Sequence, residues 1–227
     1  MPPRPPVDLV IFDCDGVLVD SEPLSMRIAT EVLAEQGAPM SMEEAYRLFL
    51  GRSEAHLKAT VAQLFNLTLT AEIMADMRSR LVRLFEAELQ PIDGVHDALD
   101  RLAHRRCVAS SSSPERIGNS LRRTRLDRYF GADVFSATMV KNGKPAPDLF
   151  LFAAERMGVV PDRCLVIEDS PAGIAAAKSA GMPVFAFTGA THGQVASHQQ
   201  AIAEAAADLV FGDMRQLPGL LAEQRLP

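Results

Sequence analysis

The apolar residues of this chain fall into short unbroken runs that are separated by longer segments with a helical period. Runs of this kind are typical of strands buried on both faces of a parallel sheet. The intervening segments carry helix signals, so the pattern predicts an α/β fold with a doubly wound, Rossmann-like parallel sheet of five or six strands. The expected strands lie at residues 9–12, 107–109, 133–136, 164–167, 184–187 and 208–211.

The segment from about residue 21 to residue 90 interrupts this alternation. Four helical patterns follow one another there without a convincing strand, and Ser53 and Thr70 are suitable N-caps for two of them. We therefore expect residues 1–20 and 91–227 to form an α/β core domain and residues 21–90 to form an inserted helical domain.

Polar side chains follow the apolar runs where the strands are expected to end. Ligands of doubly wound sheets bind beyond the carboxyl ends of the strands, so these side chains are candidates for one active site. The candidates are Asp13, Asp15, Ser110, Lys144, Glu168 and Asp169.

The spacing of Asp13 and Asp15 suggests the chemistry of that site. Side chains alternate along an extended backbone, so the two carboxylates face the same way while Cys14 points into the protein. Two close carboxylates repel unless a cation lies between them or one is protonated, which indicates a hard divalent metal, an acid/base pair, or both. Taken alone, residues 13–16 are equally typical of a polar turn, and the other strand-end clusters favour the functional interpretation.

Composition limits the partners. The chain has 227 residues, 48% hydrophobic and 23% charged, and a net charge of −6, which argues against nucleic-acid binding. No apolar stretch approaches the length that spans a bilayer, and the N-terminal MPPRPP lacks a signal-peptide core. Three cysteines beside apolar runs suggest free thiols. We expect a cytoplasmic protein, a monomer or small homo-oligomer, that acts on a small metabolite.

Residues 13–22, DCDGVLVDSE, resemble the first signature, DxDGxxxD, of the haloacid dehalogenase-like superfamily in its phosphatase and phosphomutase branch. Three further segments, VASSSS, KPAPD and VIEDS, match the later motifs in order, so the resemblance covers nearly the whole chain. It implies that Asp13 is the nucleophile and a metal ligand. It also implies that Asp15 is the general acid/base and binds the metal through its backbone carbonyl.

The later motifs have implied roles as well. Ser110 would bind the phosphoryl group, with Ser111 and Ser112 beside it at a helix N-terminus where an anion is favoured. Lys144 would balance the charge between nucleophile and phosphate, and would contact the phosphate. The acidic pair Glu168 and Asp169 would complete a Mg²⁺ site, directly or through water.

The inserted helices resemble the cap of this family. Gly51 and Arg52, in a loop with Ser53 and Glu54, are the first candidates for substrate contact. Lys58 and Ser25 are second candidates, and for these two a plain helix connection with solvated charges is at least an equal possibility. His192 could reach the site, although a structural role is the favoured interpretation. Asp20 and Ser21 are expected to form the hinge into the insert.

The resemblance leaves two functions to compare. The first is a Mg²⁺-dependent phosphatase that hydrolyses a small phosphate monoester, a sugar phosphate or sugar-acid phosphate, through an aspartyl-phosphate. The alternative is a β-phosphoglucomutase. That enzyme carries a cap histidine and a cap-loop arginine where Ser25 and Glu54 stand here, although Arg52 could take the place of the arginine. Asp15 and the acidic pair disfavour a dehalogenase, and the intact motifs disfavour a non-catalytic binding module.

Overall fold

The computed structural model describes residues 6–52 and 54–222 and separates into two compact units. The core unit comprises Met1–Asp20 and Gln90–Pro227, and the helical unit comprises Ser21–Leu89. The backbone amide of Asp20 donates to the carbonyl of Gln90 at 3.1 Å, so the outgoing and returning segments are joined within the core unit.

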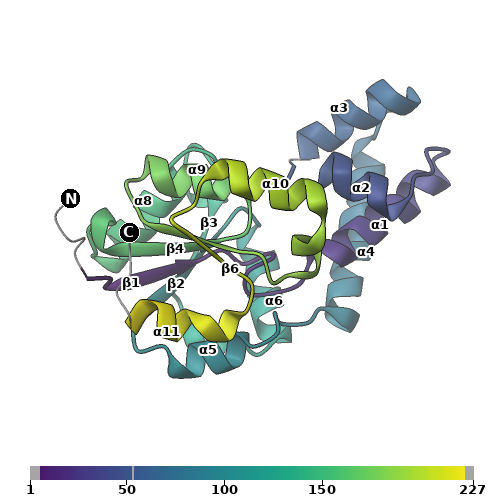
Figure 1. The fold of residues 1–227 in the computed structure, drawn as a ribbon. Helices are drawn as coiled ribbons and strands as arrows, with labels where there is room; N and C mark the ends of the chain where they lie inside the picture. Colours follow the sequence, from purple (N-terminus) through teal and green to yellow (C-terminus); the bar gives the residue numbers. More distant parts are fainter. Residues whose placement is uncertain (1–5, 53, 223–227) are drawn as a thin grey trace. The chain divides into compact units, whose positions relative to one another are not determined.

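The core unit contains a six-stranded sheet in which all paired neighbours are parallel, in the order β3-β2-β1-β4-β5-β6 (Figure 1). The predicted fold class, a doubly wound parallel sheet, is confirmed. The strands are β1 (Leu9–Phe12), β2 (Arg105–Ser110), β3 (Val134–Ser136), β4 (Cys164–Glu168), β5 (Val184–Phe187) and β6 (Leu209–Phe211).

The central position of β1 determines where a site can form. Phe12, at its end, is in register with Val108 of β2 and Ile167 of β4. The chain continues outward from β2 on one side and from β4 on the other, so the strand order reverses beside β1. Such a switch point is where doubly wound sheets bind ligands.

Helices flank the sheet on two faces. Figure 1 shows α8, α9 and α10 along one face and α5 and α11 along the other. The helices of the core unit are α5 (Val95–Arg101), α6 (Pro114–Arg123), α7 (Asp127–Phe130), α8 (Asp148–Met157), α9 (Pro171–Ser179), α10 (Ala196–Ala205) and α11 (Leu217–Ala222), with short 3₁₀ turns η1 (Ala137–Met139), η2 (Pro161–Arg163), η3 (Thr191–Gln194) and η4 (Met214–Gln216).

Two of these helices begin just beyond strands β2 and β4 for reasons that lie in the sequence. The side chain of Ser113 accepts a hydrogen bond from the Arg116 amide, and Pro114 occupies the first position of α6. Ser170 and Pro171 start α9 in the same way. A capping hydroxyl followed by proline fixes the first residue of a helix, so the strand-to-helix turns are defined locally.

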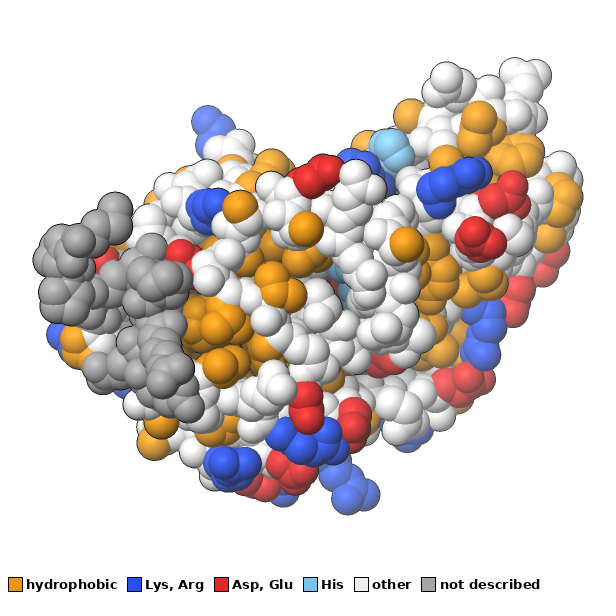
Figure 2. Space-filling view, in the orientation of Figure 1, with side chains coloured by type: hydrophobic (Ala, Val, Ile, Leu, Met, Phe, Trp, Pro, Cys, Tyr) orange, Lys and Arg blue, Asp and Glu red, His pale blue; other side chains and the backbone are white. Residues whose placement is uncertain are grey.

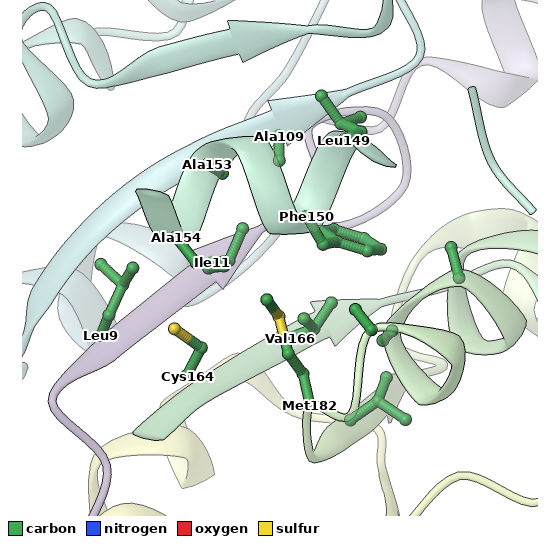
Figure 3. Packing of buried hydrophobic residues seen from close by; sticks show 14 of the residues in the cluster. Leu9, Ile11, Ala109, Leu149, Phe150, Ala153, Ala154, Cys164, Val166 and Met182 are labelled. Carbon is green, nitrogen blue, oxygen red and sulfur yellow. The ribbon is translucent and has the colours of Figure 1, made fainter. Parts of the chain in front are cut away.

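The core lies between the sheet and its helices. Leu9 and Ile11 of β1 and Val166 of β4 are fully buried. Figure 3 shows α8 lying across β1, with Ala153 and Ala154 on the side that faces the strand. Alanines at this contact let the helix approach the sheet closely. This close packing holds the strand ends, and the loops that follow them, in fixed positions.

The cysteines belong to this core. Cys14, Cys107 and Cys164 are buried and free, as predicted. Burial raises the pKa of all three thiols, that of Cys164 to about 12. Because the thiolate is the nucleophilic form, these residues do not supply a nucleophile at neutral pH.

The helical unit consists of α1 (Glu22–Glu35), α2 (Met42–Phe49), α3 (Glu54–Phe65) and α4 (Ala71–Glu88), without a strand among its described residues. Ser41 and Glu44 form a capping box at α2, and Thr70 caps α4 as predicted. Ser53, the predicted N-cap of α3, lies outside the described residues. The unit has a separate apolar core that includes Val32, Leu33 and Val61. The role of the helical unit as a cap domain of the family stays a prediction.

Charged side chains of both signs are mixed on the described surface in Figure 2. On the face that Figure 2 presents, basic side chains lie beside acidic ones and no extended basic patch is visible among the described residues. Across residues 6–52 and 54–222, no helix is both long enough and apolar enough to cross a membrane.

Candidate active site

Lys144 joins three segments that are far apart in the sequence. Its Nζ lies 2.6 Å from Oδ1 of Asp13, 2.6 Å from Oε1 of Glu168 and 3.1 Å from the carbonyl oxygen of Ala109. The side chains of Lys144, Asp13 and Glu168 are 5%, 9% and 1% exposed. The loop between η1 and α8 thus delivers a buried ammonium to the carboxyl ends of β1, β2 and β4.

Burial and the neighbouring charges shift the pKa values of Asp13 and Lys144. Burial raises the pKa of Asp13 well above its ordinary value, Lys144 opposes this, and the neighbouring carboxylates raise it further. Burial alone would lower the pKa of Lys144, but Asp13 and Glu168 raise it above the ordinary value for lysine. Lys144 therefore stays charged, and one cation is shared between two buried carboxylates. A further cation beside Asp13 would favour the charged form of its carboxylate.

Asp15 has different partners from Asp13. Oγ of Ser112 donates to its Oδ2 at 2.6 Å, and Nη2 of Arg116 donates to its Oδ1 at 3.0 Å. Both donors come from the segment that starts α6. Arg116 is absent from the sequence predictions, because an arginine in the first turn of a helix carries no signal of its own.

The serines after β2 divide into separate roles. Ser110 is buried, and its Oγ accepts a hydrogen bond from the amide of Ser112 at 3.1 Å. Ser111 is exposed, Ser112 holds Asp15, and Ser113 caps α6. Ser110 and Ser112 thus lie at the carboxyl edge of the sheet beside the carboxylates, and phosphate binding by the three predicted serines stays a prediction.

The two acidic residues after β4 also differ. Oε2 of Glu168 accepts hydrogen bonds from the amides of Asp169 and Ser170 and from Oγ of Ser170, at 2.9, 2.8 and 2.9 Å. With Oε1 on Lys144, both oxygens of Glu168 are engaged. Asp169 is also buried, and its Oδ2 lies 2.8 Å from Nε2 of His192. His192, for which a structural role was the favoured interpretation, therefore contacts a candidate site residue.

The predicted metal ligands are not a preformed cage. Within residues 6–52 and 54–222, no group of three or more His, Cys, Asp or Glu side chains is placed to hold a metal ion. The donor types nevertheless fit Mg²⁺, which takes few protein oxygens and shares the rest with water and phosphate. Asp13 and Asp169 are buried carboxylates whose pKa values burial raises, and repulsion by Asp169 raises that of Asp13 further. A cation beside them would relieve that repulsion.

Gly16 brings the loop that follows β1 against Asp169. Its φ is +81°, and a Cβ built on it would lie 2.0 Å from Oδ2 of Asp169 and 2.7 Å from Cε1 of His192. No side chain fits this space. Glycine is thus required here both for the backbone conformation and for the contact.

Gly16→Ala is expected to lower the free energy of unfolding by more than the roughly 1–2 kcal/mol that a left-handed alanine costs, because the methyl group must also displace Asp169. Urea unfolding of Gly181→Ala provides the control, since Gly181 has φ +72° but no atom within 4 Å of its built Cβ. Equal stability of the two variants would contradict the close contact.

The predicted cap residues lie in the helical unit. Gly51 and Arg52 are exposed between α2 and α3, and Ser53 lies outside the described residues. Lys58 donates to Glu54 at 2.6 Å, and Ser25 donates to the carbonyl of Ser21 at 3.1 Å. Substrate contact by Gly51 and Arg52 stays a prediction.

Comparison with known proteins identifies the family. Residues 7–181 match the family described as haloacid dehalogenase-like hydrolase, and this span holds the strand-end carboxylates and Lys144. The chain belongs to the haloacid dehalogenase-like hydrolase family. The predicted family and the prediction of an enzyme are confirmed.

Individual relatives match most of the chain. The chain is 30% identical to a 6-phosphogluconate phosphatase of Escherichia coli, over 94% of each protein. It is 35% identical to a phosphorylated carbohydrates phosphatase of Thermotoga maritima, over 78% of this chain and 82% of that protein. A haloacid dehalogenase-like protein of unknown function from Agrobacterium tumefaciens is 39% identical, with a TM-score of 0.87 over 96% of this chain and 98% of that chain.

Proposed function

We propose that this protein is a Mg²⁺-dependent phosphatase that hydrolyses small phosphate monoesters through an aspartyl-phosphate on Asp13. The observation that carries the proposal is the 2.6 Å contact between Asp13 and the buried ammonium of Lys144 at the switch point of the sheet. A carboxylate held there is positioned as a nucleophile, and the adjacent positive charge can stabilise a phosphoryl group.

In the first step a carboxylate oxygen of Asp13 bonds to phosphorus and the bond from phosphorus to the ester oxygen breaks. Asp15, in its protonated form, gives its proton to the leaving oxygen. Water then attacks the phosphorus of the acyl phosphate and passes a proton to Asp15, and inorganic phosphate leaves with the Asp13 carboxylate restored. Ser112 and Arg116 orient Asp15, and Lys144 balances the charge on the phosphoryl oxygens.

Asp13, Asp169 and the backbone carbonyl of Asp15 would hold the Mg²⁺. When bound, the cation neutralises charge on the phosphoryl oxygens. Glu168, whose oxygens contact Lys144 and the start of α9, would act on the metal only through water and serves to place Lys144.

The substrate class is inferred from the relatives. Two phosphatases that match most of this chain are named for a sugar-acid phosphate and for phosphorylated carbohydrates. We therefore infer a sugar phosphate or sugar-acid phosphate. Glu54 stands where a mutase would carry an arginine, and a carboxylate cannot supply that positive charge, which supports the phosphatase over the mutase.

A panel of hexose, pentose, sugar-acid and three-carbon phosphates tests this proposal. Phosphate release should rank sugar or sugar-acid phosphates first. β-Glucose 1-phosphate belongs in the panel, with glucose 6-phosphate followed separately. Isomerisation without phosphate release would contradict the phosphatase and favour the mutase.

A further inference from the structure

His192 enters the site from a part of the chain that the family match does not include. It lies in η3, in the loop between β5 and α10, eleven residues beyond the matched span that ends at residue 181. The side chain is 1% exposed, and its Nε2 lies 2.8 Å from Oδ2 of Asp169. In the tautomer with hydrogen on Nε2, the ring donates to the carboxylate.

The ring is held on two sides. A Cβ built on Gly16 would lie 2.7 Å from Cε1 of His192, so the loop that follows β1 packs directly against the imidazole ring. The ring of His198, from α10, packs against it edge to face with centroids 4.9 Å apart. His192 therefore has little freedom to turn away from Asp169.

The loop that carries His192 is itself anchored. A Cβ on Gly193 would lie 2.1 Å from the carbonyl oxygen of Thr188, which shows how tightly the loop folds on itself. Nε2 of Gln199 donates to the carbonyl of Gly193 at 3.0 Å, and the amide of Thr191 donates to Oδ1 of Asp20 at 3.3 Å. The imidazole thus projects from a fixed backbone.

We propose that His192 is a positioning residue that holds the Asp169 carboxylate in the orientation in which it binds Mg²⁺. Among the described residues, His192 is the donor to this carboxylate, whereas the neighbouring Glu168 carboxylate accepts four hydrogen bonds. A buried carboxylate that loses its donor pays a desolvation cost and can rotate. Partners that orient a metal-binding side chain contribute about 10- to 100-fold to metal affinity or activity.

The inference rests on the proposed function, because it takes Asp169 as a metal ligand. Its test compares His192→Gln with His192→Met. The two replacements have similar length and volume, but only glutamine keeps a nitrogen donor that can reach Asp169. Thr191→Val controls for damage to the loop, because it removes the neighbouring hydroxyl group that donates to Asp20.

Mg²⁺ binding is measured by isothermal titration calorimetry without substrate, beside circular dichroism of each variant. We expect His192→Met to weaken Mg²⁺ binding about 10- to 100-fold, and His192→Gln and Thr191→Val to stay near wild type. If the methionine variant does not fold, His192→Asn replaces it, because its shorter amide cannot reach Asp169.

Two negative results are distinguishable. Wild-type Mg²⁺ affinity in folded His192→Met, or in folded His192→Asn if that is the variant used, would overturn this inference and leave the proposed function standing. A wild-type protein that binds no Mg²⁺ would overturn the proposed function and the inference together.

Discussion

Asp13→Asn is expected to lower kcat for phosphate release by about 10⁴-fold or more, because an amide cannot form the acyl phosphate. Asparagine has nearly the same shape and removes a charge from a buried cluster in which several carboxylates share one lysine. The fold should therefore persist. Steady-state phosphate release and thermal unfolding of the purified variant measure the two effects.

Asp162→Asn is the matched control for this change. Asp162 is exposed in η2, before the amino end of β4, whereas the active-site carboxylates lie at the carboxyl ends of the strands. The control should retain full activity. Turnover by Asp13→Asn equal to that of Asp162→Asn would contradict the assignment of the nucleophile.

Lys144→Met is expected to abolish activity and also to destabilise the fold. Removing one partner of a buried ion pair costs about 3–5 kcal/mol, because a charge is left buried without compensation. Here the loss would leave both Asp13 and Glu168 without the cation that lies 2.6 Å from each. Urea unfolding in metal-free buffer, together with phosphate release, measures the two losses.

Lys141→Met in the same loop separates the role of Lys144 from general damage to the loop. Lys141 is exposed, so its replacement should change the free energy of unfolding very little. If Lys144→Met unfolded at the same urea concentration as Lys141→Met and kept its activity, the buried ion pairs of Lys144 would contribute neither to stability nor to catalysis.

The strand-end residues could be predicted because their positions depend on local signals. A short apolar run predicts the end of β1 at Asp13, and the cap residues Ser113 and Ser170 mark where α6 and α9 begin. Parallel strands then bring these ends to one edge of the sheet. The prediction that the carboxylates of Asp13 and Asp15 face the same way did not reveal that the two have separate partners.

Arg116 and the contact of His192 with Asp169 show what the sequence could not predict. Neither residue belongs to a motif. Arg116 reaches Asp15 from the first turn of α6, and His192 reaches Asp169 from η3, so both contacts depend on tertiary packing. The path of the loop between β5 and α10 depends on the close contacts of Gly189 and Gly193 with backbone carbonyl oxygens of Gly212 and Thr188. Contacts of that kind arise only once the strands are assembled, and no periodicity in the sequence encodes them.

Phosphate release by the wild-type protein with and without Mg²⁺ tests the central claim most directly. The substrate is the sugar phosphate or sugar-acid phosphate that ranks first in the panel, assayed with Mg²⁺, after removal of metal with EDTA, and after Mg²⁺ is restored. The account predicts release with Mg²⁺, loss with EDTA and recovery when Mg²⁺ returns. Equal release in the absence of divalent metal, or no release of phosphate from any member of the panel, would contradict it.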